Sequence, residues 1–131
     1  MTNQELYHAA AYLLSEDPAY YENTEDYYDR APFILATFLS ECAYVDKRYR
    51  LANGLEPISV PTSASVELSD EFPFSDALIH AAIHYLAGML VLDENESLGE
   101  HFLDRFNDAI ASLLASLPTR SESIADRYHL I

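Results

Sequence analysis

The sequence predicts an all-α protein, a small four-helix bundle built around one apolar helix. The main observation is the segment 75–92, SDALIHAAIHYLAGMLVL, in which apolar residues point in every direction around a helix. A helix that is apolar nearly all round is buried on all sides. The segment would be only about 27 Å long and carries two histidines in its middle, which argues against a membrane span. Low glycine content and the absence of tryptophan also favour helices over a β-sandwich.

Length and charge narrow the class of protein. We expect residues 1–131 to form one domain, because the chain has the length of a single domain. It carries 22 acidic and 7 basic residues, a formal net charge of −15. This charge repels phosphate backbones, so we expect no direct sequence-specific nucleic-acid binding. Residues 1–15 lack the features of a signal peptide, and the lone Cys42 has no internal disulfide partner, which indicates a reducing compartment.

The first helix is expected over residues 2–14, where Thr2 and Glu5 have capping-box spacing. The following segment, 16–29, combines six acidic residues with four tyrosines. It is either a solvated connector whose tyrosines lie on the bundle or a surface that contacts a partner, since tyrosine is enriched at interfaces. The candidate partner contacts in this segment are Tyr20, Tyr21, Tyr27 and Tyr28.

A second, long helix is expected over residues 29–52. Asp29 is a suitable N-cap, which would place Pro32 in the first turn, where its missing N–H has no cost. Gly54 is a natural C-terminal stop. Cys42 falls on the apolar face of this helix and is interpreted as a small core residue rather than a reactive thiol.

Residues 55–74 contain three prolines and show no helical period, so they are expected to form a long non-helical loop or hairpin. Two short runs alternate as strands would. The segment is therefore a small hairpin, an arm that becomes ordered against a partner, or a loop folded back over the bundle, and we favour the arm. Its candidate partner contacts are Ile58, Val60, Val66 and Leu68.

The apolar helix 75–92 is followed by a polar break at 93–95. A fourth, amphipathic helix is expected to start at Ser97, in a second capping box with Glu100, and to stop at Pro118. Because the break is short, the third and fourth helices should be antiparallel neighbours. The tail 119–131 is either a short docked helix or a mobile segment.

Four residues interrupt the apolar helix on one face: Asp76, His80, His84 and Gly88. His80 and His84 have the i,i+4 spacing that zinc sites use, but no glutamate accompanies them as it does in zinc proteases. We interpret them as partly buried structural histidines and expect no metal and no cofactor. Gly88 on the same face indicates that a neighbouring helix approaches closely there. The sequence contains no nucleophile motif and no phosphate-binding loop, so we expect no enzymatic activity.

Three stretches resemble small proteins of tailed-phage and prophage morphogenesis: RAPFILATFLSECAYVDKRYR, FPFSDALIHAAIHYLAGMLVLDENESLGEHFLDRF and SESIADRY. The helix–break–helix at 75–117 resembles the head–tail connector, or head-completion adaptor, family. In that family an alanine-rich apolar helix runs into a short Asp/Glu/Asn break, as residues 86–95 do here. This chain differs by lacking the basic residues often found beside that break.

The resemblance implies a non-enzymatic, all-helical adaptor of the virion, assembled in the bacterial host cytoplasm. Such an adaptor forms a homo-oligomeric ring between the portal and the tail-completion proteins. A lumen lined with carboxylates would repel DNA and let it slide through. The alternative is an acidic helical binding or regulatory module that mimics DNA and occupies a basic protein. A third, weaker class is a metal-binding bundle.

Overall fold

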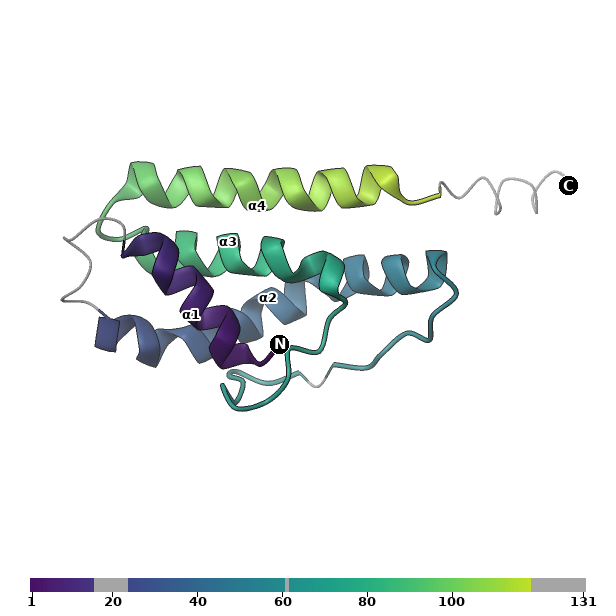
Figure 1. Cartoon of the computed structure of the whole chain (residues 1–131), viewed down its shortest axis with the longest axis horizontal. Coiled ribbons are helices and arrows are strands. Elements are labelled where there is room, and N and C mark those ends of the chain that lie inside the picture. The colour runs from purple at the N-terminus through teal and green to yellow at the C-terminus, as the bar shows by residue number, and fades with distance from the viewer. Residues whose placement is uncertain (16–23, 61, 119–131) are drawn as a thin grey trace, which may run out of the picture.

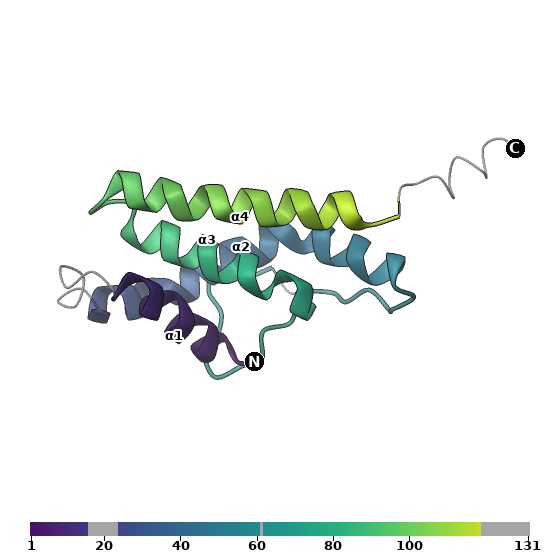
Figure 2. The same ribbon diagram turned by 45° about the horizontal axis from the view of Figure 1, so that its top comes forward.

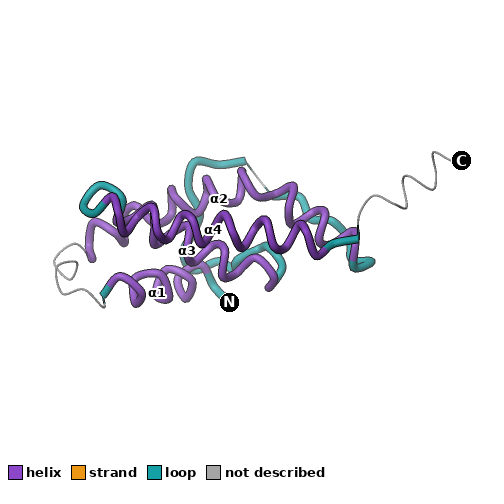
Figure 3. The backbone as a smooth tube through the Cα atoms, turned by 90° about the horizontal axis from the view of Figure 1, so that it is seen from above, coloured by secondary structure: helices purple, strands orange, loops and turns teal. Residues whose placement is uncertain are grey.

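The computed structural model describes residues 1–15, 24–60 and 62–118, and within them it confirms the all-α bundle. The elements are α1 (Asn3–Leu14), α2 (Thr24–Ala52), the 3-10 turn η2 (Asp76–Leu78), α3 (Ile79–Val91) and α4 (Glu96–Ser116). The α3 helix lies between α4 on one side and α1 and α2 on the other (Figures 1 and 2). No strand occurs in the described ranges, as the tube seen from above also shows (Figure 3).

The predicted central helix is confirmed as the core of the bundle. Its apolar side chains contact α1, α2 and α4, and Leu78, Leu86, Leu90 and Val91 are completely buried. The segment begins as the η2 turn, and the α-helical part covers 79–91, slightly less than the predicted 75–92. A helix apolar on every side requires neighbours on every side, and three helices supply them.

The expected close approach at Gly88 is also confirmed. A β-carbon built on Gly88 would lie 2.8 Å from Leu103 Cγ and 3.0 Å from the carbonyl oxygen of Gly99. A β-carbon on Gly99 would lie 2.8 Å from the α-carbon of Leu92. The two glycines therefore face each other where α3 and α4 cross, and their missing side chains set the distance between the helices.

The capping box at the start of α1 forms as predicted. The Thr2 hydroxyl accepts from the Glu5 backbone N–H at 3.1 Å, and the Glu5 carboxylate accepts from the Thr2 N–H at 2.8 Å. The hydrogen bond from the Thr2 backbone is the main cause that lowers the pKa of Glu5. Sequence spacing alone locates this helix start.

The predicted start of α2 at Asp29 is wrong, since the helix already begins at Thr24. Pro32 consequently lies inside the helix, where it cannot donate a hydrogen bond to the carbonyl of Tyr28. Arg30, which follows the additional turn, holds this part of α2 to the end of α3. The guanidinium of Arg30 donates to two carbonyl oxygens there, those of Met89 and Leu90, at 3.2 Å each.

The predicted end of α2 is confirmed. Gly54 has a φ of +71°, the left-handed conformation that glycine adopts most readily. The Leu55 N–H donates to the Arg50 carbonyl at 2.8 Å, and the Gly54 N–H donates to the Leu51 carbonyl at 3.3 Å. This pair of bonds is a Schellman motif, which satisfies the last carbonyls of the helix.

The predicted capping box of α4 is wrong in its residues. Asn95, in an extended conformation, is the N-cap, and its side-chain oxygen accepts from the Leu98 N–H at 3.0 Å. The helix therefore starts at Glu96, and Ser97 and Glu100 lie inside it. Asparagine at the cap competes well with serine, because its amide oxygen reaches the same backbone donors.

A buried carboxylate joins α2 to the start of η2. Asp46 is 1% exposed, and its two oxygens accept from Arg50 Nε and from the Ser75 N–H, both at 2.8 Å. Arg50 also donates to the carbonyl of Pro73 at 3.3 Å. The carboxylate is thus fully paired, as a buried charge requires, and it fixes where the long loop returns to the bundle.

Two predicted features lie outside the described residues. These are the tyrosine pair Tyr20 and Tyr21 in the connector and the tail 119–131. Among the helices that are described, none is both long enough and apolar enough to cross a membrane.

Candidate protein-binding surface

The loop 55–74 divides into an exposed part and a part that packs on the bundle. Residues 55–59 are exposed, with Ile58 at 39%. Val60, Val66 and Leu68 are partly buried against the core, and the phenylalanines at 72 and 74 belong to it. No hairpin forms among the described residues of the loop, and its second half is no free arm. Of the four partner contacts predicted in this loop, Ile58 stays the most accessible.

Backbone hydrogen bonds hold this second half against α1 and α2. The N–H groups of Asn3 and Gln4, in the first turn of α1, donate to the carbonyls of Asp70 and Leu68, both at 2.9 Å. The Val66 N–H donates to the Pro32 carbonyl at 3.2 Å. The loop therefore satisfies amides that a helix start leaves free, and it returns beside the N-terminal end of α1 (Figure 1).

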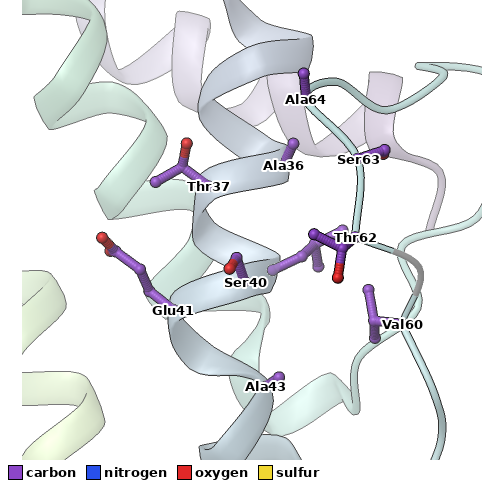
Figure 4. Close-up of a pocket in the computed structure, with 10 residues that line it drawn as sticks. Ala36, Thr37, Ser40, Glu41, Ala43, Val60, Thr62, Ser63 and Ala64 are labelled. Atoms are coloured by element: carbon purple, nitrogen blue, oxygen red, sulfur yellow. The ribbon is translucent and has the colours of Figure 1, made fainter.

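A groove of about 390 Å³ runs between α2 and the loop. Its α2 wall carries the small residues Ala36, Ser40 and Ala43, which share one side of the helix because they are four and three residues apart. Figure 4 shows Ala36 and Ala43 on the side of α2 that faces Val60. Small side chains leave a gap that the loop does not fill. We call this gap the α2 groove.

Next to the groove wall, and sharing Ser40 with it, α2 presents a row of side chains to solvent. We call it the outer stripe, and it consists of Phe33, Thr37, Ser40, Tyr44 and Leu51. Steps of four, three, four and seven residues place these side chains in line along the helix. Phe33 and Tyr44 are each 56% exposed and Leu51 is 52% exposed. Aromatic residues this exposed in a regular line are typical of a contact surface.

Sequence reasoning missed the outer stripe. The prediction for α2 used the buried face, which includes Leu35, Phe38 and Cys42, and left the large residues of the opposite face without a role. The heptad-like spacing from Phe33 to Leu51 is visible in the sequence and could have indicated a second face.

The structure buries one of the tyrosines predicted as partner contacts and leaves another exposed. Tyr27 is 2% exposed, and its hydroxyl donates to the Glu94 carboxylate, so it is a core residue and cannot be a partner contact. Tyr28 is 45% exposed, and its ring meets Tyr7 edge-on with centroids 5.6 Å apart. Burial, and then the neighbouring Tyr28, raise the pKa of Tyr7.

The two histidines of α3 lie on the side that faces α4. The ring nitrogen Nδ1 of His84 donates to the His80 carbonyl at 2.8 Å, and the ring stacks on Phe102 with centroids 6.1 Å apart. Both histidines border a shallow pocket with Arg105 and Asp108. In the described ranges, no three His, Cys, Asp or Glu side chains are grouped to hold a metal ion.

Two groups on the buried side of the bundle have strongly raised pKa values. Burial, followed by the nearby Glu41 carboxylate, raises the pKa of the Cys42 thiol to about 12. The same two causes raise the pKa of Tyr85 to about 12, and its hydroxyl donates to Glu41 at 3.4 Å. A thiol with this pKa is protonated and a poor nucleophile, in agreement with a core role for Cys42.

No protein-family model, no curated protein and no solved structure matches the chain. The strongest functional feature of the described residues is therefore the combination of the outer stripe, the α2 groove and the exposed residues 55–59.

Proposed function

We propose that this chain is a non-enzymatic adaptor of tailed-phage assembly, of the head–tail connector type, which binds other proteins through α2 and the loop after it. The outer stripe carries the protein-binding part of the proposal, and the resemblance of residues 75–117 to head–tail connectors carries the connector part. The aromatic residues of the stripe, Phe33 and Tyr44, are more than half exposed beside an open groove, on a helix whose other face is anchored in the core. A rigid helix with exposed aromatic anchors is suited to protein recognition.

The charge of the chain supports the same role. Copies with a net charge of −15 repel one another, so the isolated chain is expected to stay monomeric. A ring of copies assembled on the portal would place many carboxylates around the DNA path and prevent DNA from adhering. The proposed partners are the portal and tail-completion proteins, and the proposed location is the virion, after assembly in the host cytoplasm.

The first experiment removes the aromatic anchors of the outer stripe. The double variant Phe33→Ser with Tyr44→Ser is mixed with the portal protein of the phage to which the proposal assigns this chain, and complexes are separated by size-exclusion chromatography with light scattering. Wild type is expected to form a large closed complex, and the variant is expected to stay free with an unchanged melting temperature. The matched control is Tyr12→Ser, which removes an aromatic residue that is 75% exposed on α1.

Three results would contradict the proposal. A wild-type chain that does not bind the portal would contradict the connector role. A stripe variant that assembles as wild type does would show that the outer stripe is not the contact surface. Binding to a basic DNA-binding protein in place of the portal would support the alternative of an acidic DNA mimic.

The loop is best tested by changes to its exposed side chains. Replacing residues 57–70 with a Gly/Ser linker would remove the carbonyl acceptors of Leu68 and Asp70 and the packing of Val66. That replacement is expected to destabilise the bundle. The narrower variant Leu55→Ser with Ile58→Ser changes only side chains that are 49% and 39% exposed, so it should weaken assembly without lowering stability.

A further inference from the structure

A second pocket lies where the loop crosses the start of α1, next to the α2 groove. Its volume is about 360 Å³. The apolar part of its wall is formed by Leu39 from α2 and by Val60 and Val66 from the loop. Its polar part includes the buried Asn3 and the acidic residues of the loop. The site therefore joins an apolar wall to an acidic rim.

Asn3 has an unusual environment in this pocket. Its side chain is 2% exposed and its Nδ2 donates to the Glu67 carbonyl at 3.0 Å. Its carbonyl oxygen Oδ1 is buried and has no hydrogen-bond partner among the described residues. A buried acceptor without a partner is costly, and an N–H or O–H donor that reached it from the pocket would satisfy it.

The carboxylates that line the pocket favour a positively charged ligand. Glu67, Asp70 and Glu71 all line it. Glu71 accepts from the amino group of Met1 at 3.2 Å, whereas Glu67 and Asp70 have no ion-pair partner among the described residues. An anion would meet these carboxylates and would find the first amides of α1 already donating to the loop.

We propose that this pocket binds the side chain of an arginine presented by a basic partner protein. The methylene groups would lie against Leu39 and the two valines, while guanidinium N–H groups donate to Asn3 Oδ1 and to the loop carboxylates. Arginine has five donors in a planar fork, so it can serve acceptors on several sides at once. The carboxylates are not grouped as a metal ion requires, which favours an extended cation. Free copies of this chain repel one another at a charge of −15, so we assign the arginine to the basic partner.

The inference deepens the proposed function and rests on it for the partner being a protein, but its test uses small molecules. The full chain, labelled with ¹⁵N, is titrated with Nα-acetyl-arginine methylamide and, separately, with the citrulline counterpart, which has nearly the same shape and no charge. Saturable shifts are expected for the Asn3 side-chain amide and the backbone amides of 67–71 with arginine only.

Two variants test whether the carboxylates of the pocket bind the arginine. Glu67→Gln with Asp70→Asn, both exposed side chains, should weaken arginine binding about tenfold, since each exposed ion pair contributes a few-fold. The matched control Glu56→Gln removes an exposed carboxylate of the same loop outside the pocket and should leave binding unchanged. Circular dichroism and the melting temperature check that each variant is folded.

The outcomes separate this inference from the connector proposal. Equal shifts with citrulline, shifts spread over the whole acidic surface, or binding that Glu67→Gln with Asp70→Asn does not weaken would overturn the arginine site. Self-association of wild type that this double variant abolishes would overturn the assignment to a basic partner. A chain that binds arginine but not the portal would contradict the connector role alone.

Discussion

The crossing of α3 and α4 allows a direct test of the packing that organises the bundle. The perturbation is Gly88→Ala, one added methyl group on the buried helix. At an exposed helical site this change stabilises a protein by about 1 kcal/mol, because alanine is the better helix former. Here the added carbon would lie 2.8 Å from Leu103 Cγ and 3.0 Å from the Gly99 carbonyl oxygen. The first separation is shorter than the contact distance of two carbon atoms, and the second is shorter than the contact distance of a carbon and an oxygen.

The expected magnitude follows from these two opposing effects. Inserting a methyl group into a packed core costs about 1–3 kcal/mol. After subtraction of the helix-propensity gain of about 1 kcal/mol, Gly88→Ala should lower the free energy of unfolding by about 0–2 kcal/mol. Gly99→Ala should fall at the upper end of this range, about 2 kcal/mol, because its methyl group meets the Leu92 α-carbon at 2.8 Å, and a backbone atom cannot rotate away.

The assay is urea unfolding followed by far-ultraviolet circular dichroism. Ala111→Gly, at an exposed site of α4, measures the propensity term in this protein and serves as the control. In a Leu103→Ala background, Gly88→Ala should lose part of its cost, since the nearest side-chain atoms are gone while the Gly99 carbonyl oxygen remains at 3.0 Å. If Gly88→Ala is more stable than wild type by about the amount of stability that Ala111→Gly loses, α3 and α4 do not approach each other closely at Gly88.

Three further predictions concern buried side chains. Ile83→Asp should abolish folding, because Ile83 is 8% exposed in the central helix and an unpaired buried charge costs several kcal/mol; a cooperative melting transition would contradict this. Cys42 should resist thiol reagents at about pH 9 in the native protein and react after unfolding, since burial raises its pKa to about 12; rapid native labelling would show an accessible thiol. The pKa of Tyr85 is raised from 10.0 to about 12. The protonated hydroxyl therefore contributes its full share to the free energy of unfolding below pH 10, and this share is lost as the pH rises toward 12. The loss should be absent in Tyr85→Phe.

Local signals in the sequence determined most of the helices. The capping box of Thr2 and Glu5 and the left-handed Gly54 each act within a few residues, so their spacing predicts where α1 starts and where α2 ends. The apolar helix around 79–91 was also predictable, because no other arrangement hides a helix that is apolar on all sides.

Elements whose limits depend on distant contacts were predicted less well. In the first turns of α2, Tyr27 donates to Glu94 in the turn after α3, and Arg30 donates to the Leu90 carbonyl at the end of α3; these partners are far away in sequence. Local rules placed the start at Asp29 because Pro32 is best tolerated in a first turn, and tertiary contacts offset that preference. Burial of Tyr27 removed it from the predicted contact surface for the same reason.

The candidate site was the least predictable part. Composition and charge indicate an acidic protein that binds other proteins, and strand-like alternation is what predicts the four partner contacts in the loop. Only the tertiary structure shows that Val66 and Leu68 pack on the protein's own core, while Phe33 and Tyr44 of α2 remain outside. A periodic pattern indicates that a helix has two faces. Which face is covered depends on neighbours that come together only when the chain folds.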